Sequence, residues 1–496
     1  MQQQIVPLSS FDIVFRHGRV IDGSGSASYI ADVGLKGDRV TEIGNIPSAA
    51  GETEFDITDK VIAPGFIDAH THDDRALLNS PDMPAKASQG VTTVITGNCG
   101  ISLAPLSLQN DPPPPLDLIG KQEHYRFDRF ADYLTALEVT PAALNAACLV
   151  GHSTLRVGAM SDLERAANDD ELSEMRKAFQ SALDDGALGL SSGTFYPPAS
   201  AAPASEIAKL AELAGTAGGV YTTHMRDEAD HVLDSIRESV SIAGAGGVPL
   251  IISHHKVTGK NNHGRTHETL PLIVDAMKKG QIGLDVYPYI AASSILTAHR
   301  AAQAERVYIA WSTGAPEQAG RDLADIARDM GTSIEEAVNR LKPAGAVYFL
   351  MDEEDVQRVM QFPHTMIGSD GLPHDTHPHP RLWGTFPRVL GHYVRDIGLF
   401  SLEEAVRRMT SLTAERFGLT NRGLLRRGFY ADLVIFDAES IADTATFANP
   451  TRPASGIERV LVNGQEIWRD GSPTGNRPGR PLRRQHLAWE QEQPIV

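Results

Sequence analysis

The sequence predicts an α/β protein, a TIM-like (β/α)8 barrel with a small β-sandwich domain built from both termini. Between residues 63 and 417, short apolar runs typical of strands alternate with longer stretches whose apolar residues recur at helical spacing and end at glycine. Strands that alternate with helices indicate a parallel sheet, and this many units in about 350 residues fit a barrel with insertions. An open doubly wound sheet is the competing architecture, but no glycine-rich phosphate loop opens its first unit.

The two ends of the chain differ from its middle. Residues 1–62 and 418–480 consist of short β-type segments separated by Gly, Asn and Asp, and Asn463-Gly464 is a strong hairpin signal. We expect both parts to form one β-sandwich domain. The polar, proline-rich residues 481–496 are expected to form a tail that lies on the surface or frays.

Residues 291–345 lack the regular alternation and are predicted to be an insertion over the barrel mouth. Two stretches within this insertion have a helix-like pattern, ERVYIAWST (305–313) and RDLADIARDMGTSIEEAVNRL (321–341). The apolar run VYFLM (347–351) that follows is interpreted as a strand of the barrel.

Composition excludes several classes of partner. The chain of 496 residues has 45 Lys and Arg against 63 Asp and Glu, a net charge of −18 that makes it a poor partner for nucleic acid or an anionic membrane. No stretch approaches the roughly 18 apolar residues of a membrane span, and the N-terminus lacks the pattern of a signal peptide. We therefore expect a cytoplasmic protein that acts on a small molecule; no feature indicates an oligomeric state.

Side chains that can bind a metal follow the apolar runs at their carboxyl ends. In FIDAHTH, His70 and His72 follow a strand, and their spacing of i, i+2 places both on the same side of it. Later runs end at Cys99, His224, His254, His255 and Asp370. In a parallel barrel all strand carboxyl ends open on one face, where enzymes of this fold place their chemistry. Because imidazole, thiolate and carboxylate are ligands that suit Zn²⁺, the sequence predicts a zinc site on that face.

The chain has two cysteines, too few for a disulfide framework, and the two are expected to differ in role. Cys99 ends an apolar run and can bind metal as a thiolate. Cys148 lies inside the apolar run ALNAACLVGHS and is expected to be an inert core residue.

Several motifs together resemble one group of enzymes. They are APGFIDAHTHDD (63–74), GNCGISLAPL (97–106), GLSSGTFYPP (189–198), YTTHMRDE (221–228), ISHHKV (252–257), IGSDGLPHDTHPHPRLWGTFPRVLG (367–391) and RRGFYADLVIFD (426–437). With these motifs the chain resembles the amidohydrolase superfamily and, within it, the N-acyl-D-amino-acid deacylases, over residues 10–470. FIDAHTH alone indicates only the superfamily, whereas the cysteine of GNCG and the long motif around Asp370 indicate the deacylase branch.

The resemblance implies a metal centre. Cys99, His224 and His254 match the ligands of the tightly held zinc of these enzymes, and His70 and His72 match a second, weaker metal position. Many members of the superfamily bridge two metals with a carboxylated lysine, and the resemblance implies that Cys99 takes this bridging position here. The implied activity is zinc-dependent hydrolysis of an N-acyl-D-amino acid to a carboxylate and a free D-amino acid.

The resemblance also implies the catalytic residue and the contacts to the product amino acid. Asp370 matches the acid/base, which takes a proton from the attacking water and returns it to the leaving amine. Lys256, Tyr287, Ser293 and Arg381 match the group that binds the α-carboxylate, for which cationic and hydroxyl donors are suited.

The residues that match the side-chain pocket are Phe195, Leu296, Tyr348 and Met351, and all are apolar or aromatic. An apolar pocket favours derivatives of D-methionine, D-leucine or D-phenylalanine, because an acidic side chain would be buried there without a partner. The match of Leu296 is the least secure, since it lies in the irregular insertion.

Three alternatives stay open at this point. A deacylase of N-acyl-D-glutamate or N-acyl-D-aspartate would share the metal motifs and differ only in the pocket. Another amidase of the superfamily, such as a cyclic amidase or a dipeptidase, would share the barrel. A non-catalytic barrel scaffold is disfavoured by the intact metal and acid/base motifs.

Overall fold

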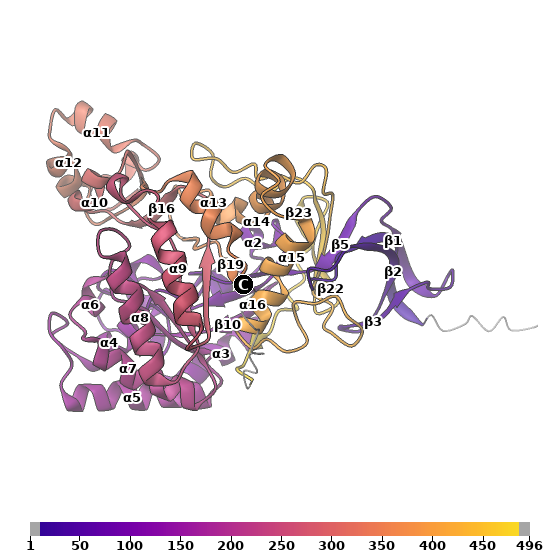
Figure 1. The fold of residues 1–496 in the computed structure, drawn as a ribbon, viewed down its shortest axis with the longest axis horizontal. Coiled ribbons are helices and arrows are strands. Elements are labelled where there is room, and N and C mark those ends of the chain that lie inside the picture. The colour runs from indigo at the N-terminus through magenta and orange to yellow at the C-terminus, as the bar shows by residue number, and fades with distance from the viewer. Residues whose placement is uncertain (1–9, 486–496) are drawn as a thin grey trace, which may run out of the picture.

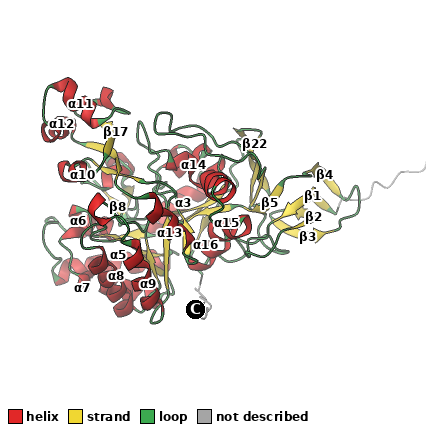
Figure 2. Cartoon of the chain, turned by 45° about the horizontal axis from the view of Figure 1, so that its top comes forward, coloured by secondary structure: helices red, strands yellow, loops and turns green. Residues whose placement is uncertain are grey.

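The computed structural model of the chain describes residues 10–485, and one nine-stranded sheet joins strands from both ends of this range (Figures 1 and 2). Its strands follow the order β23-β22-β21-β20-β5-β1-β2-β3, with β4 beside β1. They are β1 (Phe11–Val20), β2 (Tyr29–Lys36), β3 (Arg39–Gly44), β4 (Gly51–Asp56), β5 (Val61–Pro64), β20 (Leu433–Phe436), β21 (Ile457–Val462), β22 (Gln465–Arg469) and β23 (Ser472–Pro473). The antiparallel pair β5–β20 joins the two ends.

The hairpin signal in this sheet is confirmed. Asn463 and Gly464 connect the antiparallel strands β21 and β22, and both have a positive φ, 48° and 81°. A two-residue turn of this kind needs positive φ at both positions, which Asn and Gly tolerate best. The sheet thus combines residues from both predicted end segments, while the proposed domain boundaries stay a prediction.

The middle of the chain forms parallel strands, as the alternation predicts. β6 (Phe66–Asp68), β7 (Val91–Thr96) and β10 (Asn145–Cys148) pair in parallel, with β24 (Pro481–Leu482) at the outer edge of β10. A second group pairs in the order β11-β12-β13-β14-β15-β19. Its strands are β11 (Val150–Gly151), β12 (Gly189–Gly193), β13 (Val220–His224), β14 (Leu250–Ile252), β15 (Ile282–Val286) and β19 (Thr365–Ile367).

Hydrogen bonds connect the two groups at both edges. Only Leu149 separates β10 from β11, and the amide of Leu188 donates to the carbonyl of Cys148. At the other edge the amide of Ala69 donates to the carbonyl of Ile367, and the amide of Asp370 donates to the backbone carbonyl of His70 over 2.8 Å. The backbone contacts therefore run from β6 through β19 and return to β6, so the α/β class is confirmed.

Helices lie outside the parallel strands (Figure 2). The longer ones are α3 (Phe130–Val139), α4 (His152–Ala159), α5 (Asp169–Asp184), α7 (Ala204–Thr216), α8 (Val232–Gly246), α9 (Thr266–Met277), α13 (Glu353–Gln361), α14 (Arg381–Arg388) and α15 (Leu402–Met409). Short elements connect them: α1 (Ala76–Asn79), α2 (Pro84–Ala87), α6 (Pro197–Ser200), α16 (Ser411–Arg416), the strands β8 (Leu106–Ser107) and β9 (Arg126–Phe127), the 3₁₀ turns η1 (Leu116–Leu118), η2 (Gln122–His124) and η3 (Lys260–Asn262), and the π-helical turn η5 (Val389–Asp396).

Local sequence explains where these helices begin and end. At the start of α5 the side chain of Asn168 accepts from the amide of Glu171, and the side chain of Glu171 accepts from the amide of Asn168. α8 ends at Gly246 and is capped by Gly247, whose φ of 59° favours glycine.

The insertion is larger than the sequence predicts and contains a sheet. β16 (Ala291–Ile295), β18 (Ala344–Phe349) and β17 (Arg306–Ser312) form an antiparallel sheet with β18 in the centre. The helices α10 (Ala298–Gln303), α11 (Leu323–Met330) and α12 (Ile334–Leu341) and the turn η4 (Pro316–Gln318) complete it. In both views α11 and α12 lie at the opposite end of the molecule from β1–β3 (Figures 1 and 2).

Two predictions for this insertion are wrong. The stretch 305–313 was expected to be a helix, but its β-branched and aromatic residues form β17, which hydrogen-bonds to β18. The run VYFLM was expected to be a barrel strand, but it contributes to β18, the central strand of the insertion sheet. The predicted helix over 321–341 is present as α11 and α12.

The start of the predicted tail is ordered. Pro481–Leu482 pairs with β10, and the guanidinium of Arg484 donates to the carbonyls of Ala187 and Leu183. The rest of the predicted tail, 486–496, and the first nine residues of the predicted sandwich lie outside the described residues. Within residues 10–485, no helix is long and apolar enough to cross a membrane.

Candidate metal centre

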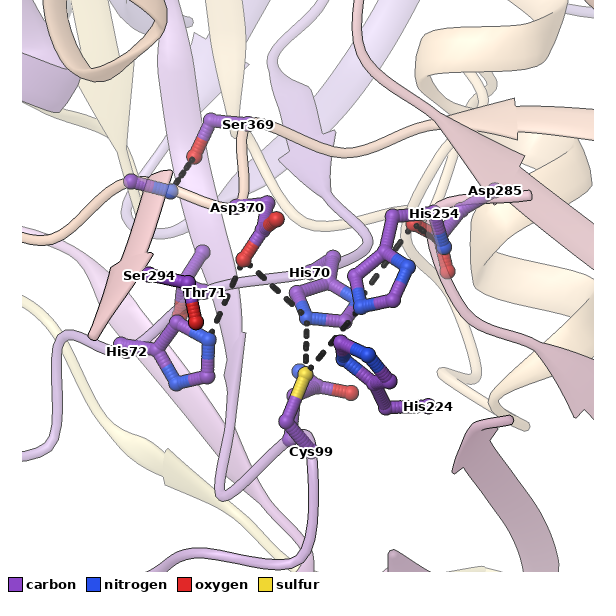
Figure 3. Close-up of polar contacts among 12 residues, drawn as sticks. His70, Thr71, His72, Cys99, His224, His254, Asp285, Ser294, Ser369 and Asp370 are labelled. Carbon is purple, nitrogen blue, oxygen red and sulfur yellow. Dashed lines mark hydrogen bonds and ion pairs between the residues drawn. The ribbon is translucent and has the colours of Figure 1, made fainter. Parts of the chain in front are cut away.

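The predicted metal ligands converge in two groups that share Cys99 (Figure 3). One group consists of His70, His72, Cys99 and Asp370, and the other of Cys99, His224 and His254. In each group the potential ligand atoms lie within 4.8 Å of one another, and all of these residues are buried. Residues that are hundreds of positions apart in sequence thus meet at the carboxyl ends of the parallel strands, as expected for this architecture.

Three of these residues have strained backbone conformations. Cys99, His254 and Asp370 have φ values of 54°, 36° and 50°, in the left-handed region that residues other than glycine rarely adopt. Strain of this kind costs about 1–3 kcal/mol per residue and persists where the surroundings fix it, typically at functional sites. Each of the three directly follows a parallel strand or the short turn after one, where the chain leaves the sheet.

The donor set fits a metal ion. The Sγ of Cys99 lies 3.2 Å from Nε2 of His70 and 3.4 Å from Nε2 of His254 (Figure 3). Both ring nitrogens of His224 are buried and have no hydrogen-bond partner among the described residues. A buried imidazole without a partner is unfavourable unless a ligand completes it, so His224 is the strongest sign of a metal.

The charges around Cys99 favour its thiolate form. Burial alone would raise the pKa of the Cys99 thiol, but His70 and His254 beside it hold this pKa well below its usual value. Cys148 shows the contrast, because burial raises the pKa of its thiol to about 12. The predicted difference between a reactive and an inert cysteine therefore agrees with their surroundings.

Asp370 is held as a carboxylate. Its Oδ1 lies 3.2 Å from Nε2 of His72, and its Oδ2 lies 2.9 Å from Nη1 of Arg381. Burial would raise the pKa of Asp370, but Arg381 and His72 hold this pKa well below the usual range. An ionised carboxylate next to the metal-binding groups can accept a proton.

Acidic residues behind the histidines fix their orientation. Oδ1 of Asp285 accepts from the amide of His254 and lies 3.4 Å from Nδ1 of His70. Oε1 of Glu228 lies 3.1 Å from Nδ1 of His254 and 2.8 Å from Nζ of Lys256. Metal-binding histidines commonly hold such a partner on their second nitrogen, which sets the tautomer.

A cavity of about 400 Å³ opens on this cluster. It is lined by five of the predicted ligand and acid/base residues, His72, Cys99, His224, His254 and Asp370, and by the predicted carboxylate-binding residues Lys256, Tyr287 and Ser293. Arg381 does not line it; its guanidinium packs behind Asp370 and 4.4 Å from the ring centroid of Tyr287. His70 is fully buried behind the lining.

None of the four predicted side-chain pocket residues lines this cavity. The ring of Phe195 packs against His224, with 5.3 Å between centroids, and the hydroxyl of Tyr348 donates to the carbonyl of Ile295. Leu296 is buried in the insertion, and Met351 lines a separate cavity of about 280 Å³ behind His254. The assignment of these four residues to the substrate side-chain pocket stays a prediction.

Sequence reasoning missed several residues of the lining. They are Ile101, Leu118, Tyr196, Ala292, Ser294, Arg300 and Leu372. Tyr196 directly follows Phe195, and Ser294 directly follows Ser293. Their position next to a predicted site residue is the only sequence feature that indicates them. Arg300 lies in α10 of the insertion and carries no motif or spacing that could have indicated it.

A profile of the amidohydrolase family matches residues 53–287 and 290–468. The chain belongs to the amidohydrolase family. The match includes every predicted metal ligand and Asp370, so the resemblance predicted from the motifs is confirmed.

Named relatives cover nearly all of this amidohydrolase. The D-aminoacylase of Alcaligenes xylosoxydans xylosoxydans is 54% identical over 474 residues, which are 96% of this chain and 98% of the relative. The N-acyl-D-aspartate deacylase of the same organism is 50% identical over 473 residues, 95% of each chain. A crystal structure of N-acyl-D-glutamate deacylase from Bordetella bronchiseptica, complexed with zinc and a phosphonate inhibitor that mimics the tetrahedral intermediate, has a TM-score of 0.93 and 43% identity, covering 96% of this chain and 100% of that chain.

Proposed function

We propose that this amidohydrolase hydrolyses N-acyl-D-amino acids to a carboxylate and a free D-amino acid, with Zn²⁺ as its cofactor. The observation that carries the proposal is the convergence of Cys99, His224, His254 and Asp370 on one cavity. The substrate class and the D configuration are supported by the names of the relatives above, D-aminoacylase and N-acyl-D-aspartate deacylase.

The residues divide into a tight and a weaker metal position. Cys99, His224 and His254 would hold one zinc ion, and His70 with His72 would hold a second, sharing Cys99 between the two positions. When bound, zinc acts as a Lewis acid on the acyl carbonyl and lowers the pKa of water from about 15.7 towards about 7. Thiolate and imidazole donors favour the binding of zinc, whereas magnesium and calcium favour oxygen donors.

Asp370 moves the proton. It accepts a proton from the water whose oxygen bonds to the acyl carbon, because Arg381 and His72 keep it ionised beforehand. It then gives this proton to the amide nitrogen as the C–N bond breaks, so that the amine leaves in a neutral form. This proton transfer requires a carboxylate that can reach both the attacking water and the amide nitrogen. Asp370 lines the cavity beside the metal-binding residues.

The carboxylate of the amino acid would meet Lys256, Tyr287 and Ser293. The hydroxyls of Tyr287 and Ser293 are buried without a hydrogen-bond partner among residues 10–485, which leaves both free to donate. Arg381 supports this group from behind through Tyr287. These contacts would orient the scissile amide relative to Asp370.

We also propose that the parallel strands β6 to β19 form the (β/α)8 barrel expected from the sequence. The hydrogen bonds from Ala69 to Ile367 and from Asp370 to His70 support its closure. Residues 63–417 would then be the catalytic domain, with the β-sandwich formed by 1–62 and 418–480.

A panel of steady-state rates tests the function. The N-acetyl derivatives of D- and L-methionine, D- and L-leucine, and D- and L-glutamate separate configuration from side-chain class. We expect turnover of D-configured substrates, which stops after removal of metal with a strong chelator and returns with zinc. If the zinc-loaded protein hydrolysed none of these amides, the result would contradict the proposal.

A further inference from the structure

The turn that carries Cys99 has an unusual backbone. It consists of residues 97–100, and Gly97, Cys99 and Gly100 have φ values of 77°, 54° and 78°. Most of its residues thus have a positive φ, and the two glycines give the turn many alternative conformations in isolation. Contacts from other parts of the chain are therefore needed to fix the position of Cys99.

The hydroxyl of Ser191 bridges the two ends of this turn. Ser191 lies in β12 and is fully buried. Its hydroxyl donates to the carbonyl of Gly97 and accepts from the amide of Gly100 over 3.0 Å. In many β-turns the first carbonyl and the fourth amide hydrogen-bond directly to each other, whereas here the hydroxyl stands between them. Neither contact involves the Sγ of Cys99, so Ser191 acts on the backbone of the turn.

The end of β12 also contacts the backbone of Cys99 and His224. A β-carbon at Gly193 would overlap the carbonyl oxygen of Cys99, so only glycine allows this close approach. Gly193 is the register partner of His224 on β13, and the amide of Thr194 donates to the carbonyl of His224 over 3.2 Å. The end of β12 thus fixes the backbone of two of the three residues that the proposed function assigns to the tight zinc position.

We propose that Ser191 is a positioning residue for zinc, whose hydroxyl holds the turn of Cys99 in its metal-binding conformation in the absence of metal. This proposal rests on the proposed function, because it requires zinc at Cys99. It also gives a role to the serine and the second glycine of GLSSG at the start of the motif 189–198, from which the sequence analysis uses only Phe195.

Loss of the hydroxyl should move Cys99. Without it the buried carbonyl of Gly97 and the buried amide of Gly100 lose their partner, which is unfavourable. The turn can satisfy both groups by closing directly on itself, and Cys99 lies between them. Since Cys99 belongs to both groups of potential ligands, this movement would weaken both metal positions. Residues that orient a ligand from outside typically contribute about 10- to 100-fold to metal affinity.

Ser192 offers a matched control for Ser191→Ala. It is the next residue of β12 and is equally buried, but its hydroxyl contacts the hydroxyls of Tyr221 and Thr223 over 2.8 Å each. Ser191→Ala and Ser192→Ala therefore remove the same group, with two hydrogen bonds, from the same strand. Only the first removes a contact to the turn of Cys99.

The zinc affinity of the full-length protein, measured by competition with a chromophoric chelator, tests the proposal. We expect the dissociation constant of Ser191→Ala to be about 10- to 100-fold higher than that of the wild-type protein, and that of Ser192→Ala to stay close to wild type. Ser191→Thr, which keeps the hydroxyl, should bind zinc more tightly than Ser191→Ala. Equal affinities in the two alanine variants would overturn the proposal. A wild-type protein that binds no zinc would instead overturn the proposed function.

The absorption spectrum of the cobalt-substituted protein shows whether Cys99 moves. A thiolate bound to Co²⁺ gives a charge-transfer band that depends on the geometry of the cobalt–sulfur bond. At saturating Co²⁺ we expect this band to shift or weaken in Ser191→Ala but not in Ser192→Ala. An unchanged band in Ser191→Ala would overturn the proposal, because Cys99 would then keep its position without the hydroxyl.

Hydrogen exchange of the wild-type protein gives a measurement that does not depend on the folding of variants. If Ser191 holds the turn before metal binds, the amide of Gly100 should exchange slowly in the zinc-free protein, at a rate within about tenfold of that in the zinc-loaded protein. Exchange of this amide at the rate of an unprotected chain in the zinc-free protein would show that the metal, and not Ser191, orders the turn.

Discussion

The buried ion pair of Arg156 and Glu206 differs from the metal centre in whether its hydrogen-bonding groups are satisfied, although Nδ1 of the neighbouring His152 has no hydrogen-bond partner among residues 10–485. In the first, between α4 and α7, every guanidinium nitrogen of Arg156 contacts an oxygen. Both carboxylate oxygens of Glu206 also accept, from Arg156 and His152 on one side and from the amide of Ala167 on the other. In the metal centre, by contrast, His224, Tyr287, Ser293 and Arg300 all have polar atoms without a hydrogen-bond partner among residues 10–485.

This difference in hydrogen-bond satisfaction distinguishes residues that stabilise the fold from residues that bind a ligand. A buried ion pair whose atoms are all satisfied, like that of Arg156 and Glu206, can be accounted for by the fold alone. Buried donors without partners are unfavourable for the fold, and where they line a cavity a ligand can complete them. Mutations should therefore cost stability in the first cluster and activity in the second.

The largest effect is expected for Asp370 in the metal centre. Asp370→Ala removes proton transfer, which typically contributes about 10²- to 10⁴-fold, and it should lower kcat by at least that factor. The free energy of unfolding should also fall, because Arg381 loses its buried counter-ion, so kcat is expressed per folded protein. Steady-state kinetics and urea unfolding of the same preparation measure both quantities. Near wild-type kcat would move the proton-transfer role to another residue.

The reverse pattern is expected for Glu206 in the satisfied cluster. Glu206→Gln leaves the charge of Arg156 buried without its counter-ion, which typically costs about 3–5 kcal/mol of the free energy of unfolding. Glu174→Gln is the matched control, because Glu174 pairs with Lys177 on the exposed face of α5 and should contribute less than about 1 kcal/mol. Urea unfolding compares the two variants, while kcat of the folded fraction should stay the same. A loss of kcat without a loss of stability would contradict the distinction.

The carboxylate of Glu206 should also make the stability of the protein depend on pH, and this effect is expected to be smaller than the loss caused by Glu206→Gln. Burial alone would raise the pKa of Glu206, but His152 and Arg156 hold it at about 2, below its ordinary value of 4.5. The lowered pKa means that its stabilising contribution is present above about pH 4.5 and is lost as the pH falls towards 2. Thermal unfolding as a function of pH should therefore show a shallower acid loss in Glu206→Gln than in the wild-type protein. Identical slopes would show that Glu206 does not carry this linkage.

The sequence predicted the metal cluster because each of its members stands where an apolar strand ends. His70, Cys99, His224 and Asp370 follow runs whose pattern alone indicates a strand, and parallel topology brings strand ends together. Arg300 could not be found in this way. Its orientation depends on stacking with Phe195, which lies about a hundred positions earlier in the chain and in another element.

The same limit explains the errors in the fold. A run of five apolar residues such as VYFLM fits a parallel or an antiparallel strand equally well, and only its partners β16 and β17 decide. The strand Pro481–Leu482 is too short to show any period, and it exists because β10 offers an edge to pair with. Long-range pairing determined these elements, whereas local pattern determined the helices and the ends of the parallel strands.

The metal content of two cysteine variants tests the central claim most directly, since the chain has only these two cysteines and buries both. We expect about one tightly bound zinc ion per chain in the wild-type protein and in Cys148→Ala, which removes only a core thiol. Cys99→Ala should lose this zinc on dialysis and lose activity with it, because Cys99 belongs to both groups of ligands. Retention of tightly bound zinc and full activity in Cys99→Ala would contradict the account.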